Sequence, residues 1–127
     1  MKSNDLASFI KSTIKGYNKK LKMRIVPSNG WMFDINCVIT DIVIEHSPKI
    51  IFISNAFAFN NKEYHNRTTW GLLNSLSNKP DYDVAFEVYG WNGKSNRQFL
   101  TEYPTLENIA IEENDDYVVI TINIESI

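Results

Sequence analysis

The sequence predicts an α+β fold: a curved, mostly antiparallel sheet of about six to seven strands with two helices packed on one face. Most apolar residues alternate with polar ones, as in half-buried strands, whereas two segments space them by three and four residues, as in helices. Short runs of turn residues separate neighbouring strand segments, which favours antiparallel pairing. The 127 residues are expected to form a single α+β domain, residues 1–127, large enough to bury a core.

Ser3 or Asn4 can cap the first predicted helix, at the N-terminal end of the sequence. Gly16 weakens the centre of this helix or ends it, so its C-terminal boundary is left open by one turn. Lysines lie opposite its apolar stripe, which consists of Leu6, Phe9, Ile10, Ile14, Tyr17 and Leu21. A basic amphipathic helix can lie on an anionic membrane. The serines on its polar side favour a surface helix that covers a sheet.

A short strand over 23–26 precedes a long second strand with an apolar face. That face carries Trp31, Phe33, Ile35, Cys37 and Ile39. The apolar phase then changes, because Asp41 and Glu45 occupy positions that should be inward. A β-bulge near Thr40–Asp41, or a sharp bend, would reconcile the two halves of the strand.

The third predicted strand follows Ser47-Pro48, and its inward face consists of Ile51, Ile53, Phe57 and Phe59. After a polar loop, Asn66 or Thr68 begins the second helix. The apolar residues of this helix are expected to pack inward: Trp70, Leu73 and Leu76.

A β-hairpin over 82–103 is the stretch around which the remaining elements are arranged. Its first strand alternates Val84, Phe86 and Val88 with outward residues, and Asn92-Gly93 suits a two-residue type I′ turn. The outward face mixes aromatic with acidic side chains, which makes it the most informative surface in the sequence.

The loop length decides the register of this hairpin. The two-residue loop places Phe86 opposite Phe99 and Asp83 opposite Glu102. Like charges directly opposite each other are unfavourable. A four-residue loop over 92–95 is the alternative, and it shifts the pairing and removes the clash.

The chain closes with a short strand over 108–112, an acidic turn over 113–116 and a strand over 117–124. The last strand turns Val118, Ile120, Ile122 and Ile124 to one face. The predicted core joins residues from most of the elements: Phe33, Ile53, Trp70, Phe86, Phe99, Ile120 and Ile122.

No set of residues converges on a catalytic centre in the sequence. His46 and His65 stand alone, without metal-binding spacing, and Cys37 alternates with apolar residues as a buried cysteine does. The five glycines are scattered, so there is no Gly-rich phosphate loop, and the acidic turn lacks the ordered ligands of a calcium loop. We therefore expect no enzyme, no cofactor and no bound metal.

Charge is distributed unevenly along the chain. Residues 1–24 hold seven Lys and Arg residues and one acid, whereas residues 25–127 hold six and fourteen. An acidic bulk repels nucleic-acid phosphates and attracts a basic protein, although a merely solvated face is the alternative. Aromatic side chains among acids can anchor and steer such a partner. The predicted partner-binding residues are Asp83, Glu87, Tyr89, Trp91, Glu102, Glu112, Glu113, Asp115 and Asp116; the lysine-rich first helix is the alternative face.

A small acidic α+β protein without a cofactor, rich in Asn, Lys and Ile, resembles the immunity proteins of bacterial polymorphic and contact-dependent growth inhibition toxin systems. The resemblance implies a cytoplasmic antitoxin that binds its cognate toxin, commonly a basic nuclease, and blocks the active site of that toxin. No apolar run is long enough to span a bilayer, and the N-terminus has no signal-peptide core, so no membrane partner is expected. Two alternatives stay open: a phage or mobile-element accessory protein that binds another host protein, and a curved sheet that binds a small ligand.

Overall fold

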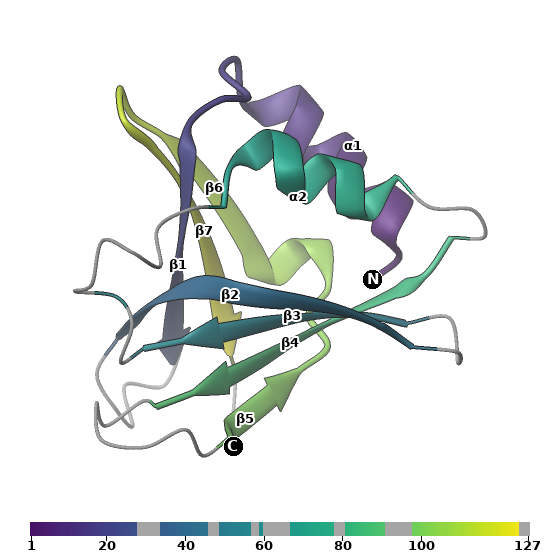
Figure 1. Cartoon of the computed structure of the whole chain (residues 1–127), viewed down its shortest axis with the longest axis vertical. Helices are drawn as coiled ribbons and strands as arrows, with labels where there is room; N and C mark the ends of the chain where they lie inside the picture. The colour runs from purple at the N-terminus through teal and green to yellow at the C-terminus, as the bar shows by residue number, and fades with distance from the viewer. Residues whose placement is uncertain are drawn as a thin grey trace.

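The computed structural model describes residues 1–27, 34–45, 49–56, 59, 67–77, 81–90 and 98–124. Within these ranges the chain forms two α-helices, a short 3₁₀ helix and seven strands (Figure 1). Their bounds are α1 (Ser3–Thr13), β1 (Lys20–Pro27), β2 (Ile35–Glu45), β3 (Lys49–Asn55), α2 (Thr69–Leu76), β4 (Asp83–Tyr89), β5 (Gln98–Glu102), the 3₁₀ helix η2 (Leu106–Asn108), β6 (Ile109–Glu113) and β7 (Tyr117–Ile124).

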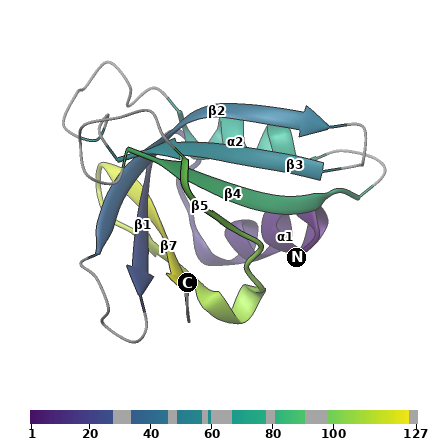
Figure 2. The ribbon, with the colours of Figure 1, turned by 90° about the horizontal axis from the view of Figure 1, so that it is seen from below.

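The seven strands form one mixed sheet in the order β5-β4-β3-β2-β1-β7-β6. Four of its pairings are antiparallel, and β3/β4 and β1/β7 are parallel. A parallel pair needs a crossover connection, and α2 lies in the connection between β3 and β4. The predicted α+β fold, a curved and mostly antiparallel sheet with both helices on one face, is confirmed (Figures 1 and 2).

β2 carries the bend that divides the sheet into two halves. Its first residues pair with β1, and its part from Val38 onward pairs with β3. The register shifts between Ile39 and Asp41, so the bulge predicted near Thr40–Asp41 is confirmed. The half that contains β3, β4 and β5 therefore lies at a steep angle to the half that contains β1, β7 and β6, and both helices lie inside this angle (Figures 1 and 2).

The short connection between β5 and β6 shows how strongly the sheet curls. These two strands are the outer strands of the sheet, yet they follow each other in the chain. The seven residue steps from Glu102 to Ile109 span at most about 25 Å, whereas the edges of a flat seven-stranded sheet lie about 29 Å apart. The sheet must therefore curve to bring its two outer strands within reach of each other, and η2 lies in the connection between them.

The core fills the space between the helices and the inner face of the sheet. The helices contribute Leu6, Ile10, Leu72, Leu73 and Leu76, and every strand from β1 to β4, as well as β6 and β7, contributes apolar residues. The rings of Phe52 and Phe86 stack with centroids 5.3 Å apart. Of the predicted core, Phe86, Ile120 and Ile122 are confirmed; Phe33 lies outside the described residues, and Phe99 is described in its backbone alone.

α1 is shorter than the longest helix that the apolar stripe allows. It ends at Thr13, three residues before Gly16, and Leu21 is buried in β1 instead of continuing the helix. The prediction that Ser3 or Asn4 is the N-cap is wrong, because the helix already includes Ser3. The carboxylate of Asp81 takes that role from a distant part of the chain: it accepts hydrogen bonds from Ser3 Oγ and Asn4 N, both at 2.8 Å, and these hold the pKa of Asp81 below its usual value.

Two side chains predicted to be in the core lie elsewhere. On β3 the inward residues are Ile50, Phe52 and Ser54, so the assignment of Ile51 and Ile53 to the inward face is wrong. The segment is apolar on both faces, and alternation alone cannot choose between them.

Trp70, predicted to be in the core, is 57% exposed. α2 begins after the predicted cap Thr68, whose Oγ1 accepts a hydrogen bond from Gly71 N. The buried face of α2 is centred on Leu72, Leu73 and Leu76. Trp70 lies about 110° around the helix from the centre of that face and is therefore not buried by it.

The β4–β5 hairpin has a different register from the two-residue-loop prediction. Phe86 pairs with Glu102, so the predicted pairs Phe86–Phe99 and Asp83–Glu102 are wrong. Tyr89 pairs with Gln98, which is the pairing that a four-residue loop over 92–95 implies, although that loop lies outside the described residues. A register shift follows between Val88 and Tyr89. The predicted inward face of β4 is confirmed, with its three apolar residues buried.

Candidate functional site

The predicted acidic binding surface does not come together in the fold. Asp83, Glu87 and Tyr89 lie on β4, whereas Glu112 and the β6–β7 turn belong to the other end of the strand order. The two views place this turn and the start of β4 on opposite sides of the molecule (Figures 1 and 2). The members of this set whose side chains are described therefore form two separate groups and not one continuous surface.

The acids of β4 have partners within the chain. Asp83 forms a salt bridge of 3.0 Å with Lys2. Glu87 accepts a 2.8 Å hydrogen bond from the Tyr89 hydroxyl, and this bond raises the pKa of Tyr89. Trp91 lies outside the described residues, and Glu102 is placed by its backbone alone, opposite Phe86. Of the described acids of the predicted hairpin surface, Asp83 is thus paired with a cation, and Glu87 keeps its charge but has a hydrogen-bond partner.

Glu113 holds two parts of the chain together. Its carboxylate accepts hydrogen bonds from the backbone N–H of Lys15 at 2.9 Å and of Gly16 at 2.8 Å, and it forms a salt bridge of 2.9 Å with Lys19. These donors lower the pKa of Glu113 from its usual 4.5 to about 2, with Lys19 as the largest cause. A Cβ atom at Gly16 would lie 3.2 Å from the carboxylate, so glycine allows this close approach. Glu113 thus holds the α1–β1 connection and already has partners within the chain. The other acids predicted to bind a partner in this region, Glu112, Asp115 and Asp116, are exposed.

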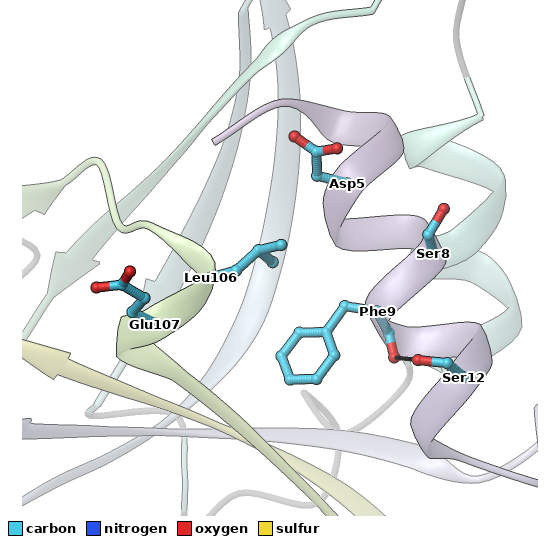
Figure 3. A pocket seen from close by; sticks show the side chains of 6 residues that line it. All are labelled: Asp5, Ser8, Phe9, Ser12, Leu106 and Glu107. Carbon is cyan, nitrogen blue, oxygen red and sulfur yellow. Dashed lines mark hydrogen bonds between the residues drawn. The ribbon is translucent and has the colours of Figure 1, made fainter.

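An open groove lies elsewhere, between α1 and η2 (Figure 3). It has a volume of about 630 Å³. We call it the α1–η2 groove, and its lining consists of Asp5, Ser8, Phe9, Ser12, Leu106 and Glu107. Figure 3 shows Phe9 and Leu106 projecting toward each other from the two helices.

Local sequence and tertiary structure both build this groove. Its four residues on α1 follow the spacing of three and four that places side chains on one helix face. The Ser12 hydroxyl donates to the Phe9 carbonyl at 2.9 Å, which ties it to the helix backbone (Figure 3). Phe9 packs against the core and forms the inner wall, while Leu106 remains 38% exposed.

The charge of the α1–η2 groove has one sign. Asp5 and Glu107 are both exposed, and within the described part of the chain neither forms a salt bridge and no Lys or Arg lines the groove. The groove thus combines an apolar floor, formed by Phe9 and Leu106, with two uncompensated carboxylates. Such a surface attracts cationic groups that also carry apolar area.

Sequence reasoning missed this groove for a specific reason. The spacing of Asp5 and Phe9 on one helix face was visible, but Phe9 was assigned wholly to the buried stripe. Leu106 and Glu107 lie in a three-residue 3₁₀ helix, which has no periodic signal of its own. No pattern joins segments that are about a hundred positions apart.

Cys37 is buried as predicted, and burial raises the pKa of its thiol to about 12. His46 and His65 lie outside the described residues. Among the residues that the structure places, no group of three or more His, Cys, Asp or Glu residues could hold a metal ion. The same residues include no helix of the length and hydropathy that a membrane span requires.

Comparisons of this chain with known protein families, with curated proteins and with solved structures find no match.

Proposed function

We propose that this protein is an immunity protein, an antitoxin of the bacterial cytoplasm that binds a basic toxin domain and neutralises it without catalysing a reaction. The observation that carries the proposal is the α1–η2 groove, where two uncompensated carboxylates flank an apolar floor. We place the contact with the toxin there. The sequence also resembles toxin-immunity proteins in size, acidic charge and composition, and this resemblance suggests a toxin as the partner.

A Lys or Arg side chain of the partner suits both properties of this groove. Its aliphatic stem can cover Phe9 and Leu106 while its charged end meets Asp5 or Glu107. Carboxylates at the rim also raise the rate of association with a basic surface, and salt reduces this effect by screening the charges. The apolar pair supplies the area that slows dissociation.

The hairpin surface is a weaker candidate for the same contact. A partner would have to compete with Lys2 for Asp83 and with the Tyr89 hydroxyl for Glu87. The exposed acids of the β6–β7 turn stay a separate prediction, and the experiment below distinguishes them from the groove.

Co-expression tests the proposed function. The chain would be produced together with the product of each neighbouring reading frame, and growth would be measured. We expect protection from one toxic product, and a purified complex with it. Failure to protect against any of these products, or protection without a complex, would overturn the proposal.

Charge reversal tests the proposed location. Asp5→Lys and Glu107→Lys are expected to weaken the complex by about tenfold each at low salt, and less at high salt. Asp34→Lys is the matched control, because it reverses an exposed acid that does not line the groove. If Asp116→Lys abolishes binding and the groove variants bind normally, the function stands and the contact lies at the β6–β7 turn.

A small cationic amphiphile is a second candidate ligand, because the volume of the groove falls in the range of small-molecule sites. This reading predicts that a compound with one ammonium group and a short alkyl chain binds the free protein. Binding that is lost in Glu107→Lys and kept in Asp34→Lys would favour it over a protein partner.

A further inference from the structure

Three cations lie in a row on the sheet face opposite the helices. β1 alternates Lys20, Lys22 and Arg24 with the buried residues Leu21, Met23 and Ile25, so the cations share the outer face. Successive members of the row are about 6.7 Å apart along the strand. On the β7 side, the register places Tyr117, Val119 and Thr121 next to the row.

Arg24 is the member with unmet hydrogen-bonding capacity. Its Nε atom is buried and has no hydrogen-bond partner, and the same is true of Oγ1 of Thr121. The two residues are neighbours in the β1–β7 register, and Asn36 of β2 lies on the other side of Arg24. Unpaired buried donors are costly, and two of them side by side point to a missing acceptor.

The remaining cations differ in how far they are compensated. Lys20 shares a hollow of about 480 Å³ with Asp115 and Asp116. Lys22 lies with its Nζ 3.6 Å from the centre of the Tyr117 ring, a contact that holds the ammonium group in place while leaving its charge unneutralised. By contrast, Lys2 and Lys19 both have carboxylate partners. Of the three cations in the row, Lys22 and Arg24 are therefore the two that neither form a salt bridge nor share a hollow with an acid among the described residues.

We propose that Arg24, its neighbours Asn36 and Thr121 on the adjacent strands, and Lys22 form a binding site for a phosphate group. A guanidinium group presents its N–H donors in a fork that matches the oxygens of a phosphate, and the ammonium group adds charge without a fixed direction. The Thr121 hydroxyl and the Asn36 amide can donate to the same oxyanion. This site lies on the opposite side of the sheet from the helices and does not depend on the α1–η2 groove.

Calorimetry with inorganic phosphate and pyrophosphate tests the site, with sodium chloride at equal ionic strength as the reference. We expect saturable binding of one anion per chain. Arg24→Met should weaken it by about tenfold or more, the loss expected for a charge-assisted hydrogen bond. Lys11→Met is the matched control, since it removes an exposed lysine from α1, and it should leave binding unchanged.

A second variant keeps the test informative if Arg24→Met fails to fold. Thr121→Val preserves the shape of a buried side chain and removes only the hydroxyl, so it should fold and bind phosphate several-fold more weakly. A short single-stranded oligonucleotide distinguishes the sources: competition with phosphate that depends on Arg24 would indicate a phosphate carried by a polymer, and its absence a small phosphate. No saturable binding, or equal binding by Arg24→Met, Thr121→Val and Lys11→Met, would overturn the proposal.

Discussion

Truncation of Phe86 to Ala is expected to destabilise the protein by about 3–5 kcal/mol, the usual cost of removing a buried aromatic side chain. The side chain is 1% exposed and stacks on Phe52, with ring centroids 5.3 Å apart. Most of the loss comes from the transfer of the ring out of water and from the cavity that it leaves. The aromatic pair itself contributes about 0.5–1.5 kcal/mol of this, which a double-mutant cycle with Phe52→Leu would isolate.

Trp70→Ala is the matched control, because sequence pattern alone placed both aromatic residues in the core. The structure leaves Trp70 57% exposed at the start of α2. Its removal should cost less than about 1 kcal/mol, since surface substitutions have small effects and Ala is favourable in a helix.

Urea unfolding followed by far-UV circular dichroism measures both variants without relying on tryptophan fluorescence. At a denaturant slope of about 2 kcal/mol/M, a loss of about 4 kcal/mol lowers the midpoint by about 2 M. A Phe86→Ala cost below about 1 kcal/mol, or a larger cost for Trp70→Ala than for Phe86→Ala, would refute the assignment of faces to β4 and α2.

Three further outcomes are expected. Because the folded-state pKa of Glu113, about 2, lies below its usual 4.5, its stabilising effect is present above pH 4.5 and is lost as pH falls toward 2. Glu113→Gln should therefore flatten the fall in thermal midpoint over that range, and an unchanged slope would contradict the role of Glu113 in holding the α1–β1 connection. Cys37 should not react with a thiol reagent in the native protein at pH 8 and should react in urea, because burial raises its pKa to about 12; rapid native labelling would show that β2 opens. Asp83→Ala should cost less than about 1 kcal/mol in urea unfolding, since both partners in its salt bridge with Lys2 are about half exposed; a larger loss would mean that Asp83 has a structural role.

Sequence periodicity alone determined the elements whose two faces differ in polarity. β4 and β7 alternate apolar and other residues closely enough to define their inward faces, and the phase change near Thr40 located the bulge in β2. The cap of α2 at Thr68 was also a local signal. In each case the deciding interaction joins residues a few positions apart, and a pattern within one segment can record it.

Only the tertiary structure decided the features that depend on distant segments. β3 is apolar on both faces, and its contact with β4 determines that Phe52 and not Ile53 turns inward. The parallel pairing of Lys20 with Tyr117 and the contact of Glu113 with the α1–β1 connection join positions almost a hundred residues apart. The α1–η2 groove likewise joins α1 with a 3₁₀ helix about a hundred positions further along the chain. Periodicity records how polar each face of an element is, but it carries no information about which distant element will cover that face.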